Sequence, residues 1–322
     1  MTDHETALVL PSDTDIELLG EDAQAARGYA EKSLSDATRA AYRSDMEVFK
    51  VWCEARGVVA VPANPEVVAS FAASQAEQGL KPSTISRRLA AIRMLHRASG
   101  VETPTSSEIV TATMRGIRRE HGAAPARKTA ATSDVVLAML EHVGDDLKGL
   151  RDYSILTLGF ASACRRSELA SLMVDHVAEV SEGLIITIER SKTDQEGQGQ
   201  EVAVPRGSRA CPVVALRAWL DAAGIEDGPL FRRLRRGGHV TEDGISPRTI
   251  ATVVKKYAAL AGLDPDRFGG HSLRSGFASS AAANGATLFR LMDQTRHRSV
   301  ETVRAYVRRA GLFDEHPGEG LL

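Results

Sequence analysis

The sequence contains little cysteine, with three residues in 322, at Cys53, Cys164 and Cys211. Their number is odd and no two of them form a CxxC pair, which argues against a disulfide framework or a structural zinc site. Reduced thiols in a cytoplasmic protein are the expectation that follows.

Long apolar runs are also absent. ALVL at 7–10 is far shorter than a signal or membrane segment, so we expect no membrane partner. The sequence has no Gly-rich phosphate loop, no Ser–His–Asp spacing and no acidic metal cluster. With 43% hydrophobic and 25% charged residues, the composition is typical of a folded protein of about two domains.

An overall positive charge is missing too, since the formal net charge is −2. The acidic residues, however, gather at the ends: residues 1–30 hold seven acids and one base, and 313–322 hold three acids and no Lys or Arg. Residues 31–312 hold 39 bases and 32 acids, a balance of +7, and 81–128 hold ten bases and three acids. Nucleic-acid binding is therefore not excluded.

The first third of the chain predicts a flexible acidic arm at 1–30 and a small helical domain at 31–121. Four helices are expected, with starts at Ser35 or Asp36, at Asn64-Pro65, at Ser83, and at a capping box from Thr105 to Glu108. On the third and fourth helices, four arginines lie off the apolar stripe or near the helix end, and we take them as candidates for DNA binding: Arg87, Arg88, Arg118 and Arg119. The alternative is that these are solvated helix faces.

Residues 122–134 lack large apolar side chains and are expected to form a linker, before a second domain at 135–311 and a tail at 312–322. The second domain should begin with a helix from Ser133 or Asp134 to Val143. Segments 184–190 and 201–205 predict a β-hairpin, with Lys192 at the start of its tip, and helices should start at Pro212 and at Ser246-Pro247. The expected fold class is mainly α with a small antiparallel β-sheet.

Five cationic or potentially cationic side chains and one phenol in this second domain are candidate catalytic residues. They are Arg165, Lys192, His271, Arg274, His297 and Tyr306. On a helix, His271 and Arg274 would share one face, and an N-cap at Ser299 would let His297 and Tyr306 converge. Cations and imidazoles around a phenol suit chemistry on a phosphodiester, whose transition state carries negative charge. Taken singly, each residue could equally have an ordinary structural role.

Three motifs give this set a context. ACRRSELASL (163–172), HSLRSGFA (271–278) and HRSVETVRAY (297–306) resemble the three catalytic blocks of the tyrosine recombinases, the phage integrase family. Lys192 lies between the first two, as the family's hairpin lysine does. The resemblance implies a helical, SAM-like core-binding domain followed by an α+β catalytic domain.

The resemblance also implies roles. Tyr306 would attack the scissile phosphate and form a 3′-phosphotyrosyl bond. Arg165 and Arg274 would bind its non-bridging oxygens, and Lys192 would protonate the leaving 5′-oxygen. His271 would transfer a proton, His297 would hydrogen-bond the phosphate, and Glu168 would orient the site. Since these cations stabilise the charge, we expect no metal and no cofactor.

The partners implied are double-stranded DNA with inverted-repeat core sites and three further copies of the chain, in a homotetramer that forms a Holliday junction. The tail, with Phe313, is expected to dock on a neighbouring copy. Two residues depart from the family pattern. Arg296 stands where the family usually has Gly, which would change the turn or add a phosphate contact, and we favour the contact. Arg166 replaces an apolar residue.

Two other functions stay open on the sequence. One is strand relaxation like that of a type IB topoisomerase, which uses the same chemistry but rejoins the same strand. The other is a non-catalytic DNA-binding regulator derived from the family, although the complete set of candidate residues argues against it.

Overall fold

The computed structural model describes residues 34–122, 128–189, 199–297 and 299–310, together with scattered positions between 20 and 29. Lys192, the tail at 312–322 and almost all of the acidic arm lie outside the described residues. The chain divides into two compact units, residues 1–125 and 126–322. Each unit is described by itself.

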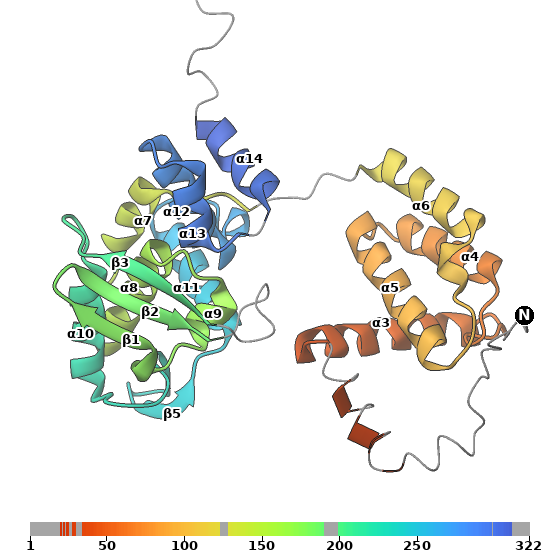
Figure 1. Ribbon diagram of the computed structural model, residues 1–322, viewed down its shortest axis with the longest axis horizontal. Helices are drawn as coiled ribbons and strands as arrows, with labels where there is room; N and C mark the ends of the chain where they lie inside the picture. The colour runs from red at the N-terminus through yellow and green to blue at the C-terminus, as the bar shows by residue number, and fades with distance from the viewer. Residues whose placement is uncertain are drawn as a thin grey trace, which may run out of the picture. The chain divides into compact units, whose positions relative to one another are not determined.

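The first unit is a group of four helices, α3 (Asp36–Glu54), α4 (Pro65–Glu77), α5 (Pro82–Ala98) and α6 (Glu108–His121) (Figure 1). The predicted caps of the first two are confirmed. The Ser35 hydroxyl accepts from the backbone N–H of Thr38 at 3.3 Å, and the Asn64 side chain accepts from Glu66 at 2.9 Å. The helices bury Phe49 and Phe71, whose rings meet edge to face with centroids 5.0 Å apart.

The starts of the other two helices differ from the prediction. Helix α5 begins at Pro82, whose missing N–H is no loss in the first turn, rather than at Ser83. Residues Pro104–Ser106 form a short 3₁₀ helix, and α6 begins at Glu108 after Ser107. Thr105 does not cap α6, because its hydroxyl is buried and accepts instead from Arg93 Nε at 3.0 Å. The predicted capping box was therefore wrong.

The second unit combines helices with two small sheets (Figure 1). Its helices are α7 (Ser133–Leu140), α8 (Leu147–Ala161), α9 (Arg166–Ala170), α10 (Pro212–Ala223), α11 (Pro247–Leu260), α12 (His271–Ala283), α13 (Leu288–Thr295) and α14 (Val300–Ala310). Its strands are β1 (Val177–Val180), β2 (Gly183–Ile188), β3 (Gln200–Pro205), β4 (Arg232–Leu234) and β5 (Val240–Gly244), with 3₁₀ turns at Val174–His176 and Pro265–Arg267. The first helix ends at Leu140, earlier than the predicted Val143.

The predicted hairpin is confirmed as β2 and β3, which pair antiparallel with Ile186 opposite Val202. Strand β1, which pairs with the other edge of β2, and the separate β4–β5 pair were not predicted. Every second residue of β2 is buried in the core of the unit, namely Leu184, Ile186 and Ile188. In the same core, α8 packs against α10, α11 and α12. The fold is mainly helical with a small antiparallel sheet, as expected.

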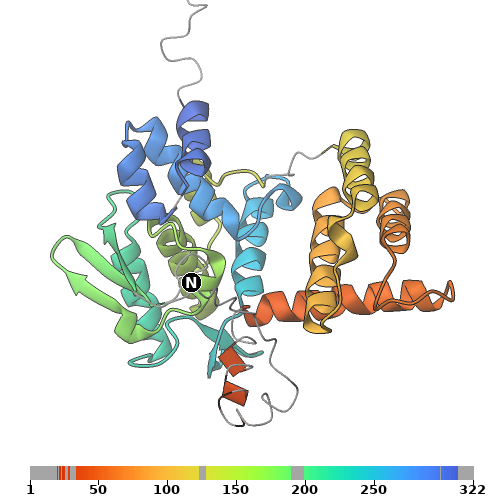
Figure 2. The same cartoon turned by 45° about the vertical axis from the view of Figure 1, so that its right-hand side comes forward.

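Helix α12 is held in place from two sides. The chain entering the unit lies along it, because Thr129 N–H bonds the Arg267 carbonyl at 2.7 Å and Ala131 N–H bonds Ser272 at 2.9 Å. Gly276 permits this close approach, since an added Cβ would lie 1.7 Å from the Ala131 carbonyl oxygen. On the other side α14 packs against α12 and α13, and the three blue helices stay together in both views (Figures 1 and 2). No helix in the described part of the chain is long and apolar enough to cross a bilayer.

Candidate active site

Arg274 lies at the centre of the site, where the α8–α9 loop, the start of α12 and the α13–α14 turn meet. Its side chain is 1% exposed. Nη1 donates to the Ala163 carbonyl at 2.6 Å, and Nη2 donates to the Thr295 carbonyl. Nε has no partner among the described residues. One buried guanidinium therefore joins two loops by their backbones, with its Nε–H left unpaired among the described residues.

Two of the residues in these loops have unusual backbone conformations. Among the described residues, Ala163 (φ 49°) and Arg296 (φ 52°) are the non-glycine residues with positive φ. Each such conformation costs about 1–3 kcal/mol unless the surroundings stabilise it, and such strain gathers at functional sites. Here Ala163 lies two residues before Arg165, and Arg296 directly precedes His297. Both strained residues thus fix the direction of a candidate catalytic side chain.

Arg165 precedes α9 and shares a carboxylate with Arg296. The Arg165 backbone N–H donates to Glu168 Oε2 at 2.7 Å and its Nη1 donates to Oε1 at 2.6 Å. Arg296 Nη2 donates to Oε2 at 2.6 Å. Burial would raise the pKa of Glu168, but the charge of Arg296 and the hydrogen bonds from Arg165 hold it below its usual value. Glu168 is therefore ionised and holds both Arg165 and Arg296, which is compatible with the orienting role expected of it.

His297 occupies the turn between α13 and α14 in a defined hydrogen-bond chain. The Thr295 hydroxyl donates to the Leu291 carbonyl, so its oxygen accepts from His297 Nδ1 at 2.6 Å. His297 Nε2, 3.3 Å from Arg274 Nη2, must then be the acceptor. Burial, followed by the charges of Arg274 and Arg165, lowers the pKa of His297 to about 4. The imidazole is neutral at pH 7 in the absence of a ligand.

His271 is the first residue of α12, and its side chain reaches the surface. Desolvation lowers its pKa, and the charges of Arg274, Arg165 and Arg166 lower it further. Arg166 is exposed and lies against Gly270, where an added Cβ would come within 2.9 Å of it. The structure thus places both His271 and Arg166 at the open side of the cluster.

The electrostatic balance of this cluster favours an anion. Three guanidiniums, those of Arg165, Arg274 and Arg296, face one carboxylate, that of Glu168. Burial and the charges of Arg165 and Arg296 lower the pKa of Arg274 to about 10, so it keeps its charge at neutral pH. An oxyanion that binds here would relieve repulsion between cations, which is what a phosphodiester in its transition state requires. The described residues contain no group of three or more His, Cys, Asp or Glu placed to hold a metal ion.

Tyr306 lies about two turns into α14, which begins directly after Ser299 as predicted. The side chain is half-buried, and Val303 of the same helix is fully buried. The Tyr306 hydroxyl makes no hydrogen bond to the described residues. The structure brings Arg165, His271, Arg274 and His297 together. Lys192 lies outside the described residues.

The predicted phosphate contact of Arg296 is wrong for this structure. Its side chain is 3% exposed and its guanidinium points inward to Glu168, 128 residues earlier in the chain. The left-handed φ also gives a reason why a glycine would suit this position. Sequence reasoning noted the unusual arginine but missed its partner, because no local spacing connects the two residues.

The four arginines of the first unit divide into two kinds. Arg87 makes two hydrogen bonds to the buried Asp45, at 2.7 and 3.0 Å, and Arg88 lies 3.6 Å from the same carboxylate with its side chain 16% exposed. Arg118 and Arg119 of α6 are exposed, and Arg118 donates to the Ser86 hydroxyl at 3.3 Å. Arg87 and Arg88 are therefore partners of Asp45, whereas the α6 pair is open to solvent.

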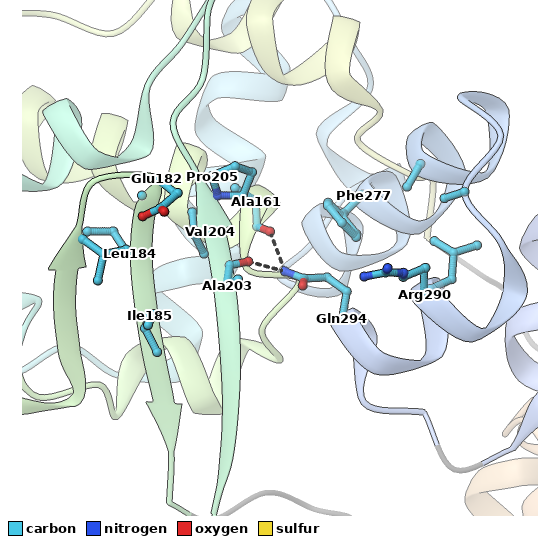
Figure 3. A pocket seen from close by; sticks show the side chains of 15 residues that line it. Ala161, Glu182, Leu184, Ile185, Ala203, Val204, Pro205, Phe277, Arg290 and Gln294 are labelled. Atoms are coloured by element: carbon cyan, nitrogen blue, oxygen red, sulfur yellow. Dashed lines mark hydrogen bonds between the residues drawn. The ribbon is translucent and has the colours of Figure 1, made fainter.

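A groove of about 690 Å³ separates the sheet from α12 and α13 (Figure 3). Figure 3 shows strands β2 and β3 on one side, with Phe277 and Arg290 on the other. Gln294 spans the groove and donates to the carbonyls of Ala161 and Ala203, at 3.1 and 3.0 Å. We call this the sheet–α13 groove.

Comparison with known proteins gives this geometry its context. Residues 130–311 match the phage integrase family, and residues 29–99 match the phage integrase N-terminal SAM-like domain. The integrase/recombinase xerD homolog of Selenomonas ruminantium is 38% identical over 292 residues, which cover 89% of this chain and 85% of the relative. Recombinase cre of Escherichia phage P1 is 27% identical over 277 residues, 80% of this chain and 79% of the relative.

A solved structure has a similar fold. A lambda integrase dimer bound to a COC′ core site matches with a TM-score of 0.58 and 15% identity, covering 92% of this chain and 77% of that one. The family match covers more than half of the chain, and the buried arginine cluster lies within it. The chain therefore belongs to the phage integrase family and is a tyrosine-type site-specific recombinase.

Proposed function

We propose that the chain cuts and rejoins double-stranded DNA at inverted-repeat core sites, with Tyr306 as the nucleophile. The observation that supports this most is the buried Arg274, which joins the loops of Arg165 and His297 into one cationic site. The relatives named above support the reaction class, and the cluster supports a phosphate as the group that binds.

In the proposed reaction the Tyr306 oxygen forms a bond to phosphorus as the bond from phosphorus to the 5′-oxygen breaks. Lys192 gives a proton to the leaving 5′-oxygen, and the proton of the phenol passes to His271. The 5′-hydroxyl of a partner strand then attacks the phosphotyrosyl bond and releases Tyr306. One phosphodiester replaces another, so no ATP or other cofactor is needed.

Arg165 and Arg274 would bind the two non-bridging oxygens, where negative charge develops. Removal of one donor of this kind typically slows a reaction by about 10²–10³-fold. His297 accepts a hydrogen bond from Arg274 when no ligand is present. To donate to a phosphate oxygen from Nε2 while Nδ1 still donates to Thr295, it must take up a proton, which a bound phosphate would favour by raising its pKa.

Recombination joins two sites, and we propose that four copies of the chain assemble on them in the cytoplasm. The tail at 312–322, which lies outside the described residues, is the segment proposed to contact a neighbouring copy. The sheet–α13 groove supports this proposal because it is lined mostly by apolar residues and lies beside α13, against which α14 packs. A contact passed from each copy to the next can close into a ring.

A plasmid assay tests the proposal. The target site is first recovered as DNA bound in cells by a Tyr306→Phe variant, and two copies are cloned into one supercoiled plasmid. The full chain should delete or invert the segment between the sites and form Holliday junctions. Relaxation of plasmids without sites would instead identify a type IB topoisomerase activity, and binding without cutting would identify a regulator.

Truncation after residue 311 tests the assembly in the same experiment. The truncated chain should bind a single half-site nearly as well as the full chain, yet form no two-site complex in a native gel and no recombinant plasmid. Recombination at the normal rate would show that the tail has no role in assembly.

A further inference from the structure

Arg296 and Glu168 form an ion pair that the proposed reaction does not use. Their side chains are 3% and 2% exposed, and the two charged atoms are 2.6 Å apart. The pair connects α9 with the turn between α13 and α14 at a residue whose φ is 52°. Because the pair is buried and holds a strained turn, it fixes the position of the residues that follow the turn. Those residues are His297 and then α14.

The same carboxylate also binds Arg165, and this makes the charge balance important. With Arg296 present, two guanidiniums share one carboxylate, so the group of three carries one net positive charge. Without Arg296, Glu168 would neutralise Arg165 alone, and the cation expected to bind the scissile phosphate would be held inward by its own partner.

We propose that Arg296 is a positioning residue, which neutralises Glu168 so that Arg165 remains available to the phosphate and which fixes the turn that orients His297. The proposal rests on the role of Arg165 given under the proposed function. Arg296 does not touch the substrate, because Glu168 covers its guanidinium. Its contribution therefore acts on the cutting step, with little effect on DNA affinity.

The geometry gives two reasons to assign this role to the charge rather than to the turn alone. First, the Arg296 guanidinium reaches past its own turn, where its Nη1 also lies 3.5 Å from the Gln294 carbonyl, to meet the carboxylate on α9. Second, Glu168 has hydrogen bonds from Arg165 on both oxygens already, through its backbone and its side chain. Both oxygens of Glu168 would therefore be hydrogen-bonded without Arg296, and the main contribution of Arg296 is its positive charge.

The test uses the full chain and a nicked DNA that carries its site, with covalent adduct formation as the measured rate. Arg296→Gln keeps a donor for Glu168 but removes the charge. By analogy with loss of a partner that orients a metal ligand, it should slow adduct formation roughly tenfold to a hundredfold. Its affinity for the site should stay within about twofold. Arg296→Gly, which removes the backbone strain, should be equally slow.

The deciding variant is the double substitution Glu168→Gln with Arg296→Gln, because neutral residue 168 needs no second cation. The double variant should cut faster than Arg296→Gln alone. If each substitution only damaged the local structure, the double variant would be as slow or slower. Arg217→Ala, which removes an exposed arginine paired with Glu179, is the matched control and should cut at the normal rate. Thermal melting identifies any variant that fails to fold.

Two results would overturn the inference. One is a wild-type rate for Arg296→Gln or Arg296→Gly, and the other is a double variant that is as slow as or slower than the folded Arg296→Gln variant. Failure of the proposed function is distinct, since the wild-type chain itself would then form no adduct.

Discussion

His297 illustrates how strongly the site acts on one residue. Its ring accepts from Arg274 and donates to Thr295, and both contacts suit the neutral form. Its pKa in the folded chain is about 4, against an ordinary value of 6.5. Between these values the unfolded chain binds more protons than the folded chain, so folding stability rises with pH and is lost as pH falls from 6.5 towards 4.

The catalytic unit should therefore become less stable in mild acid, by at most about 1.4 kcal/mol per pH unit for this one group. Because His297 is partly exposed, solvent screening reduces the effect below that limit. His297→Gln should lose less stability than the wild type between pH 7 and pH 5 in urea unfolding. His239→Gln controls for removal of an exposed histidine. Equal acid sensitivity in wild type and His297→Gln would contradict this explanation.

At the residue scale, the sequence predicted the members of the site better than their contacts. The three motifs predicted a common site, and the structure does bring together Arg165, His271, Arg274 and His297. The roles of Arg296 and Arg88 could not be predicted, since each depends on a carboxylate far away in the chain. An ion pair between distant residues leaves no periodic signal in a sequence.

At the scale of elements, the prediction succeeded where the signal is local. The caps at Ser35, Asn64 and Ser246 are side chains that bond N–H groups two or three residues later, so spacing alone reveals them. Thr105 fits the same spacing but bonds Arg93 instead, and tertiary structure overrides the local pattern. Strands β1, β4 and β5 have three to five residues and are stabilised by distant partners, so their pattern is too short to recognise.

Helices α5 and α6 should contribute differently to DNA binding. Arg118→Ala and Arg119→Ala should each reduce the slope of log affinity against log salt by about 0.9 where the side chain meets a phosphate. Arg88→Ala should leave that slope unchanged, because its guanidinium lies beside Asp45. Its effect on the free energy of unfolding should be small, about 0–1 kcal/mol, because Arg87 keeps both hydrogen bonds to Asp45.

Salt-dependent binding and urea unfolding of the three variants check this division. A reduced slope for Arg88→Ala would show that its guanidinium meets a phosphate, which would contradict this division. Unchanged slopes for both α6 variants would mean that this face is solvated and does not bind DNA.

At the scale of the whole molecule, the net charge is close to zero although the charges are unevenly distributed along the chain. Acidic residues gather in the two terminal segments, whereas the part between them carries the positive balance. Within the catalytic unit, the positive charge is concentrated further into a buried cluster of three arginines around one carboxylate. In the proposed reaction the cluster would stabilise the charge and α14 would provide the phenol, so the reaction would depend on how α14 packs against α12 and α13.

The central claim is that Tyr306 is the nucleophile, and covalent trapping tests it most directly. The wild-type chain is incubated with a nicked substrate that loses the 5′-hydroxyl fragment, the adduct is isolated in denaturant, and the modified peptide is identified by mass spectrometry. We predict a phosphotyrosyl adduct at residue 306, and no adduct with Tyr306→Phe although that variant still binds the site. An adduct formed by the Phe variant, or one mapped to another residue, would contradict the account.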